Sequence, residues 1–194
     1  MSKIIGLTGG IGSGKTTVGT YLSSLGIPVY IADEAGRRLL QEEPVISQVR
    51  QEFGDGIIES GKVRRDILAS IVFSDEKKLQ ALNAIIHPAV QLDFQKWLAE
   101  HSKFDIVVKE SAILFETGYD ADCDYVVAVA APAELRIQRV MDRDNVSRES
   151  VLSRISNQWP QEEISRRSDF VIENSTIDEM HRQVNDFLKK MRNI

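Results

Sequence analysis

The stretch Gly9-Gly10-Ile11-Gly12-Ser13-Gly14-Lys15-Thr16 fits the pattern G-x-x-x-x-G-K-[ST] at every required position. Glycines let the backbone turn tightly, so that successive N–H groups point inward at phosphate oxygens. The lysine can reach the β- and γ-phosphates, and the threonine hydroxyl can bind Mg²⁺. The sequence therefore predicts a loop that binds a nucleoside triphosphate, and the residues expected to hold it are Gly10, Ile11, Gly12, Ser13, Gly14, Lys15, Thr16 and Thr17.

The flanks of this loop fit the same interpretation. Residues 3–7 form a short apolar run that ends in glycines, which predicts a buried strand. Residues 15–25 have helical spacing and stop at Gly26, a natural helix end. Residues 28–31 predict a second strand. Strand, helix and strand follow each other with the crossover length that a parallel pair requires.

The chain from about residue 34 to 102 is almost entirely helical in pattern. One apolar face carries Leu79, Leu82, Ile85 and Ile86, and Pro88 is placed to begin a new helix. This is too much helix for one crossover. We therefore predict an inserted, helical substrate-binding domain at about 34–103.

The remaining elements return to the first pattern. Residues 105–108, 125–129 and 170–172 predict buried strands, residues 133–167 are helical and polar, and residues 177–191 predict a closing amphipathic helix. The predicted fold class is an α/β three-layer sandwich, a P-loop NTPase with a parallel sheet. Its core comprises residues 1–33, 104–132 and 168–194, and residues of about 133–167 form a helical lid.

Composition limits the function classes. A formal charge of −5 over 194 residues argues against bulk nucleic-acid binding, and a single cysteine excludes an internal disulfide and a cysteine-rich metal site. Residues 125–133 form the longest nearly apolar stretch, far short of the ~20 residues that span a bilayer. The N-terminus lacks the pattern of a signal peptide. We expect a cytoplasmic protein with no membrane or nucleic-acid partner, either a monomer or a small homo-oligomer.

A phosphate loop alone does not separate kinases from GTPase switches or motor ATPases. GTPases usually recognise guanine with N-K-x-D, and that tetrapeptide does not occur in this chain. Residues 33–36 match D-x-x-G, but they follow the second predicted strand and open a helix, so the match carries little weight. A GTPase switch is disfavoured.

A wider set of landmarks resembles the dephospho-CoA kinase family. In chain order these are Leu7–Thr17, Leu25–Val29, Ala32-Asp33, Phe53-Gly54, Gly61 with Arg65, Ile86–Pro88, Leu114–Glu116, Cys123-Asp124, Arg139, Arg143, Arg154-Ile155 with Gln158, Ser168-Asp169 and Asn174. They keep their order over nearly the whole chain. Many members have a proline before the Leu-Phe-Glu element, an Ile-Asp pair at the second strand and an Asp at the position of Glu110; this chain departs at each of these.

The resemblance implies transfer of the γ-phosphoryl group of ATP, with Mg²⁺, to the ribose 3′-hydroxyl of dephospho-CoA, which gives CoA and ADP. Lys15, Asp33 and Arg139 would then be catalytic. Asp33 follows a strand at the sheet edge where ligands bind, and as a base it would accept the 3′-hydroxyl proton. The alternative is a plain helix N-cap, for which aspartate is well suited.

Arg139 and Arg143 lie four residues apart on one predicted helical face. Between residues 112 and 188 the chain has no lysine, and an arginine fork suits bidentate phosphate contacts. These two arginines would supply charge from a mobile lid that closes over ATP. Alternatively, they belong to a solvated helix face and pair with neighbours such as Asp142.

Further site residues rest on the resemblance. Glu110, which ends a predicted strand, would hold Mg²⁺ through water together with Thr16, or would be an ordinary strand-end residue. Arg65, His87 and Glu116 would line the acceptor pocket, although for His87 a turn before a helix is the simpler account. Asn174 and the residues after it would cradle adenine.

Two other functions stay open. One is a kinase of another small acceptor, such as a nucleoside monophosphate or a sugar. The other is a nucleotide-dependent binding switch that has no phosphoryl acceptor.

Overall fold

The computed structural model describes residues 2–73 and 75–192. By contacts, the chain divides into two compact units. The sheet unit comprises Met1–Tyr30 and His101–Ile194, and the helical unit comprises Ile31–Glu100. Each is described by itself.

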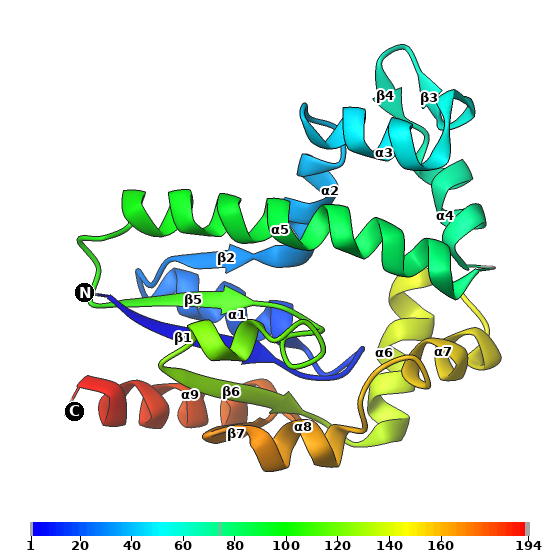
Figure 1. The fold of residues 1–194 in the computed structure, drawn as a ribbon. Helices are drawn as coiled ribbons and strands as arrows, with labels where there is room; N and C mark the ends of the chain where they lie inside the picture. The colour runs from blue at the N-terminus through cyan, green and yellow to red at the C-terminus, as the bar shows by residue number, and fades with distance from the viewer. Residues whose placement is uncertain (1, 74, 193–194) are drawn as a thin grey trace. The chain divides into compact units, whose positions relative to one another are not determined.

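The sheet unit is built on the predicted parallel sheet (Figure 1). Its strand order is β2-β5-β1-β6-β7, and the strands are β1 (Lys3–Thr8), β2 (Val29–Ile31), β5 (Ile106–Glu110), β6 (Tyr125–Ala130) and β7 (Phe170–Glu173). Strand β1 pairs in parallel with β5 and β6, and β6 pairs in parallel with β7. The predicted P-loop fold class is confirmed.

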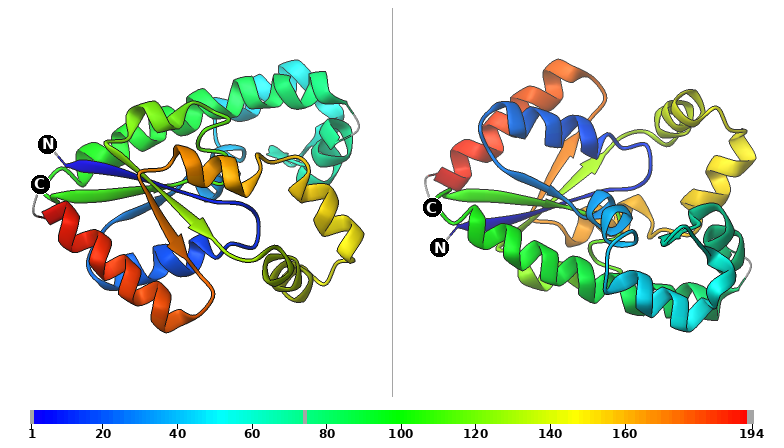
Figure 2. Two further views of the ribbon diagram at one scale, coloured as in Figure 1. Left: turned by 90° about the horizontal axis from the view of Figure 1, so that it is seen from below. Right: turned by 90° about the horizontal axis from the view of Figure 1, so that it is seen from above.

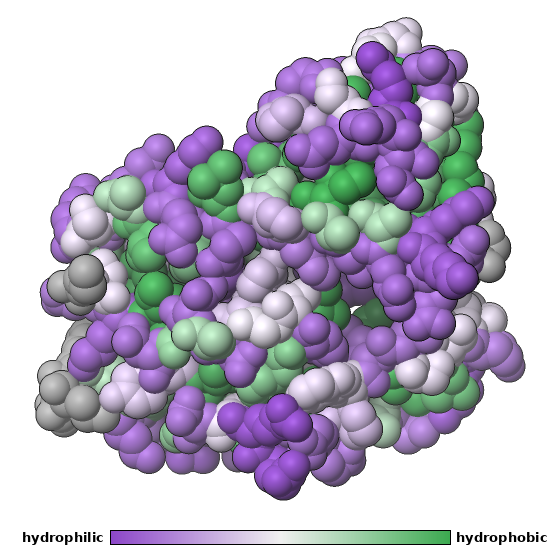
Figure 3. All heavy atoms as spheres, viewed as in Figure 1, coloured by the Kyte–Doolittle hydropathy of each residue, from purple (hydrophilic) through white to green (hydrophobic). Residues whose placement is uncertain are grey.

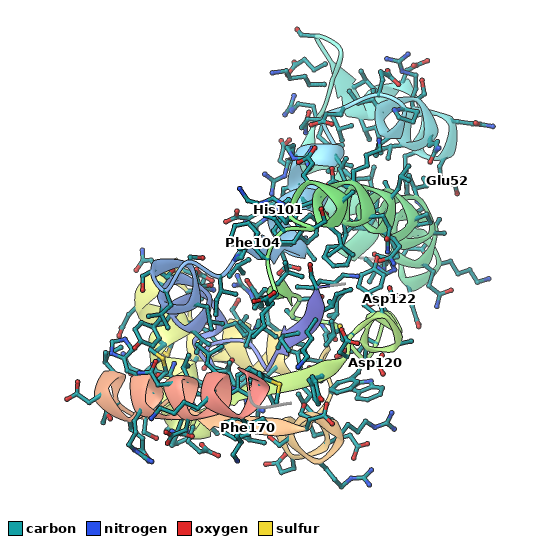
Figure 4. The ribbon with its side chains drawn as sticks, turned by 90° about the vertical axis from the view of Figure 1, so that its left-hand side faces the viewer. Glu52, His101, Phe104, Asp120, Asp122 and Phe170 are labelled. Atoms are coloured by element: carbon teal, nitrogen blue, oxygen red, sulfur yellow. The ribbon has the colours of Figure 1, made fainter. Side chains whose placement is uncertain are left out.

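Two helices, α1 (Lys15–Ser24) and α9 (Ile177–Arg192), cover one face of this sheet and lie side by side (Figure 2). Alternate strand residues such as Leu7, Val108 and Val129 form a core with the buried faces of both helices. Phe170 on β7, labelled in Figure 4, packs against Phe187 of α9, and their ring centroids are 5.4 Å apart. Burial of this apolar face is the main term that holds the unit together.

The opposite face is covered in part by the segment that follows β5. Leu114, Tyr119 and Val126 form a smaller buried cluster there, and the short 3₁₀ helix η2 (Tyr119–Asp122) belongs to the segment. Figure 4 labels Asp120 and Asp122 on it. Helix α8 (Gln161–Arg167) packs on β6. The predicted helical stretch 133–167 forms three helices, α6 (Ala133–Asp144), α7 (Arg148–Ile155) and α8.

The helical unit comprises α2 (Ala32–Leu39), α3 (Val45–Phe53), the 3₁₀ turn η1 (Asp55–Ile57), α4 (Arg65–Phe73) and α5 (Glu76–Glu100). It has its own core, which includes Val49, Ile57 and Leu68. A hairpin of β3 (Ile58–Glu59) and β4 (Lys62–Val63) interrupts the helices, which the sequence analysis did not predict. Its turn residues Ser60 and Gly61 both have positive φ, the conformation of a tight hairpin turn.

The prediction that Pro88 begins a new helix is wrong. Pro88 lies inside the continuous helix α5. Proline removes one helical hydrogen bond, but Ile86 before it packs on the core of the helical unit and Val90 after it lies beside Gly36 of α2. Packing therefore stabilises α5 as one continuous helix on both sides of the proline. His87 consequently sits in a helix, and the interpretation of it as a turn residue is wrong as well.

The surface drawn in Figure 3 is mainly hydrophilic, with hydrophobic residues in small, separate groups. Among the described residues, no helix is both long enough and apolar enough to span a bilayer.

Candidate active site

The Gly-rich loop connects the end of β1 to the start of α1. Gly9, Gly12 and Gly14 have φ values of 145°, 78° and 94°, which other residues rarely adopt. Gly14 is the N-cap of α1, in the left-handed region. The loop thus ends on a helix N-terminus, where unpaired N–H groups and the helix dipole favour an anion.

Close packing gives a second reason for these glycines. A Cβ at Gly9 would collide with the main-chain oxygen of Val129 on β6, and one at Gly12 with the main chain of Arg136 on α6. A Cβ at Gly14 would collide with the side-chain nitrogen of Asn174. Three segments distant in sequence therefore confine the loop.

Lys15 and the two threonines after it occupy the first turn of α1. The Nζ of Lys15 donates a hydrogen bond of 2.7 Å to the main-chain oxygen of Gly9, so the side chain folds back across the loop. Thr16 and Thr17 are exposed. They line one end of a groove of about 460 Å³ between α1 and α9, whose other lining residues are Thr20, Tyr21, Ser24, Ile177 and His181.

Glu110 is the last residue of β5 and lies in register with Leu7 on β1. It is 5% exposed. Strand alternation places it on the same face as Val108, which packs in the core formed with α1. Its carboxylate therefore belongs to the face and the strand end from which the phosphate loop departs.

The neighbouring Lys109 points to the other face. Its Nζ lies 3.9 Å from the ring centroid of Tyr119 and 3.8 Å from a carboxylate oxygen of Asp122. Burial lowers the pKa of Lys109, with partial compensation from Asp122. Alternation thus assigns the acidic residue to the loop side of the sheet and the basic one to the interior behind it.

Arg139 and Asn174 meet beside the loop. Arg139 donates from Nη2 to the main-chain oxygen of Asn174 at 3.0 Å, and the Asn174 side chain donates to the main-chain oxygen of Ser13 at 2.9 Å. Asn174 is only 2% exposed, so its side chain supports the loop from within. The next residues, up to Ile177, are exposed and lead to the groove beside Thr17.

Arg143 does not join this cluster. Its guanidinium donates two hydrogen bonds, of 2.8 and 3.1 Å, to the carboxylate of Asp144. These bonds raise the pKa of Arg143. Arg154 also pairs with Asp144, at 2.7 Å. The exposed pairing expected in the alternative interpretation is present, although the partner is Asp144 and not Asp142.

Three loop contacts were missed by the sequence analysis. Gln161 accepts a hydrogen bond of 3.1 Å from the N–H of Gly10, and Gln158 accepts one of 2.8 Å from the N–H of Ile11. Arg136, only 7% exposed, donates from Nε to the oxygen of Ile11 at 2.9 Å. An available signal was that Arg136 adjoins Ile137 on the apolar side of its helix, where a charge needs a specific partner.

The residues assigned to the acceptor lie in both units. Asp33 is the second residue of α2; the N-cap is Ile31, and no side chain caps this helix. The N-cap interpretation of Asp33 is therefore wrong, and its exposed carboxylate is not used as a cap. Arg65 is exposed at the start of α4. Glu116, in the sheet unit, accepts a hydrogen bond of 3.3 Å from the N–H of Trp159.

His87 is half-buried in α5, and burial lowers its pKa. Because its pKa is lowered, the imidazole is neutral near pH 7. It can then donate or accept a hydrogen bond, but it has no positive charge to attract a phosphate.

Comparison with known proteins gives a consistent result. The family model for dephospho-CoA kinase matches residues 3–179. The chain is 40% identical to the dephospho-CoA kinase of Geobacillus kaustophilus, with 98% of this chain and 97% of that protein covered. It is also 40% identical to the dephospho-CoA kinase of Bacteroides fragilis, with 90% and 85% covered.

Among solved structures, a Thermus thermophilus protein superimposes with a TM-score of 0.89 at 36% identity and covers 97% of both chains. The fold agrees with the family match over nearly the full chain. The chain belongs to the dephospho-CoA kinase family.

Proposed function

We propose that this protein transfers the γ-phosphoryl group of ATP to the ribose 3′-hydroxyl of dephospho-CoA, giving CoA and ADP, the last step of CoA biosynthesis. The observation that carries the proposal is the glycine loop at the N-terminus of α1, in a chain about 40% identical to curated dephospho-CoA kinases. Phosphoryl transfer of this kind depends mainly on positioning and charge stabilisation.

The loop binds the triphosphate tail in this scheme. The backbone N–H groups around the start of α1 and the dipole of that helix face the phosphates. Lys15 exchanges the oxygen of Gly9 for the β- and γ-phosphate oxygens, which carry more negative charge than a carbonyl. The adenosine extends over residues 175–177 toward the groove between α1 and α9.

Mg²⁺ fits the groups at this strand end. It prefers oxygen ligands, keeps several waters and needs only one or two protein ligands when phosphates supply the others. The hydroxyl of Thr16 would bind it directly and Glu110 through water. No cluster of three or more His, Cys, Asp or Glu suited to a metal is found in the described residues, consistent with a site completed by nucleotide. The ion would neutralise charge that develops on the phosphates.

Asp33 is the proposed catalytic base. Its carboxylate is exposed and is not used to cap α2, so it is available to a substrate hydroxyl. It would accept the 3′-hydroxyl proton and orient the oxygen for attack on the γ-phosphorus. The helical unit would hold the acceptor through Arg65 and His87, and Glu116 would contribute from the sheet unit.

The lid, residues 133–167, would close over ATP. Arg139 already lies beside Gly14, with its Nη1 3.8 Å from where a Cβ at that glycine would be. Release of the bond to Asn174 and rotation of the side chain would direct its guanidinium at a phosphate. Arg143 would have to leave Asp144 first. Closure would exclude water and limit hydrolysis of ATP.

The experiment is an ADP-release assay with ATP, Mg²⁺ and dephospho-CoA, with CoA identified by mass. A panel of nucleoside monophosphates and sugars tests the other kinases, and ADP release without acceptor tests the switch. CoA formation that Asp33→Asn reduces at least 100-fold, with ADP binding retained, supports the proposal. Rapid turnover of another acceptor, or hydrolysis unaffected by dephospho-CoA, contradicts it.

A further inference from the structure

Ile11 of the phosphate loop is held on three sides by the lid. Its N–H donates to Gln158, its oxygen accepts from Arg136, and its side chain packs against the apolar cluster of α6 and α7 that contains Val140 and Val151. The preceding N–H, of Gly10, donates to Gln161. Gly10 and Ile11 are thus hydrogen-bonded to side chains of the lid.

These bonds separate the loop into two halves. The N–H groups of Gly10 and Ile11 are occupied by glutamine oxygens, and that of Ser13 by the oxygen of Gly10 at 3.1 Å. The other part of the loop, from Gly14 into the first turn of α1, lies at a helix N-terminus, where the helix dipole favours an anion. Gly10 and Ile11 are therefore fixed by contacts with residues 133–167, and the part of the loop that leads into α1 follows directly after them.

The hydrogen bonds to Gly10 and Ile11 come from two side-chain amides and one guanidinium. Arg136 lies so close to Gly10 that a Cβ there would collide with its guanidinium, and burial lowers the pKa of Arg136. A buried polar group that loses its partner costs more than the bond itself contributes, so each bond fixes one orientation of the loop peptides.

We propose that Arg136, Gln158 and Gln161 are positioning residues that hold Gly10 and Ile11 in place and so set the affinity for nucleotide phosphates. In this role they act through the main chain of the loop and not by contact with the substrate. The proposal rests on the proposed function of the loop. Since all three come from residues 133–167, the same contacts transmit the position of the lid to the loop.

The test compares Gln158→Met and Gln161→Met with the control Gln138→Met. Gln138 is an exposed residue of α6 whose side chain donates a hydrogen bond to Asp142. Methionine has nearly the shape of glutamine but accepts no strong hydrogen bond. For each protein we would measure the dissociation constant of ADP by calorimetry, the KM for ATP, kcat at saturating ATP, and Tm without ligand.

For each of the two loop variants we expect a 5- to 30-fold rise in the ADP dissociation constant and in the KM for ATP, corresponding to one lost, partly buried hydrogen bond. We expect kcat within about threefold of wild type, and Gln138→Met unchanged in all four quantities. Lower Tm with unchanged ADP affinity would show a purely structural role and overturn the proposal.

If the variants fail to fold, a measurement on the wild type still tests the proposal. Hydrogen exchange should show protected Gly10 and Ile11 amides without nucleotide, and stronger protection with ADP. Amides that exchange as fast as an open loop overturn the proposal. If wild type itself does not bind ADP, the proposed function fails; if wild type binds and the variants bind equally well, only the positioning role fails.

Discussion

The side-chain nitrogen of Asn174 donates a 2.9 Å hydrogen bond to the main-chain oxygen of Ser13, which precedes it by 161 residues. This bond joins the end of β7 to the phosphate loop. It also fills the space beside Gly14, since a Cβ on that glycine would collide with the same nitrogen. The last strand therefore helps to decide which residue the loop accepts at position 14.

Gly14→Ala should destabilise the protein and weaken nucleotide binding. The substitution places an alanine at φ 94° and pushes its Cβ into Asn174. Gly26→Ala is the matched control, because Gly26 has φ 81° but nothing within 4 Å of its Cβ position. Urea unfolding should show a loss of ~1–2 kcal/mol for the control and more for Gly14→Ala.

Calorimetry with ADP completes that comparison. We expect wild-type affinity for Gly26→Ala and at least tenfold weaker binding for Gly14→Ala. Equal losses of stability and equal ADP affinity in the two variants would show that the contact with Asn174 has no consequence for the site.

Arg139→Ala should lower kcat/KM at least 100-fold, because a guanidinium aimed at transferring phosphate stabilises charge in a site that excludes water. Arg143→Ala should cost about tenfold, since Arg143 is exposed and paired with Asp144. Arg154→Ala is the control, another exposed arginine on Asp144. Steady-state kinetics with varied ATP would measure all three variants. A loss of kcat/KM in Arg154→Ala as large as that in Arg139→Ala would show that the net positive charge of the region matters and not the position of Arg139.

Glu110→Gln should raise the Mg²⁺ concentration for half-maximal activity about tenfold, as expected when an outer ligand of a metal is lost. Glu173→Gln, at the exposed end of β7, is the control. Activity would be titrated with Mg²⁺ at fixed ATP, alongside ADP binding without metal, which should not change. An unaltered Mg²⁺ requirement in Glu110→Gln removes this residue from the metal site.

Cys123 should make stability fall at high pH. Burial is the main reason that its pKa rises from 9.0 to about 12. Because the folded-state pKa is the higher one, the thiol contributes stability that is present below pH 9 and lost as the pH rises from 9 to 12. The loss is at most ~1.4 kcal/mol per pH unit.

Urea unfolding of wild type and Cys123→Ala at pH 8, 9 and 10 measures this effect. The nearby Lys109, whose pKa burial lowers, acts in the opposite sense but is present in both proteins. The wild type should lose stability relative to Cys123→Ala as the pH rises above 9. A constant difference between the two proteins would contradict the assignment.

The sheet and the loop could be predicted because their signals are local. Apolar runs such as residues 125–129 predict buried strands wherever they pack, and the loop pattern needs no partner to be recognised. Pro88 could not be placed, because the helix around it is maintained by packing with other parts of its unit. The hairpin at Ser60 was missed because strands this short carry almost no periodic signal.

The site divides in the same way. Lys15 could be placed in the phosphate loop because the loop motif specifies a lysine at that position, whereas the metal role of Glu110 rests on the resemblance and stays a prediction. The sequence analysis did not name Arg136 or Gln161, since their contacts are tertiary hydrogen bonds to the main chain of the loop; the position of Arg136 on the apolar side of its helix was the one signal available. A side chain that bonds a backbone group can do so at any residue type, so the sequence does not show which residue is its partner.

The most direct test of the account is a crystal structure with dephospho-CoA and a non-hydrolysable ATP analogue with Mg²⁺. We expect phosphates against the main chain between Gly12 and Thr16, the ribose 3′-oxygen in line with the γ-phosphorus, and a carboxylate oxygen of Asp33 within hydrogen-bond distance of that 3′-oxygen. Nucleotide bound elsewhere with this loop empty, or a 3′-oxygen turned away from the γ-phosphorus, would contradict the account.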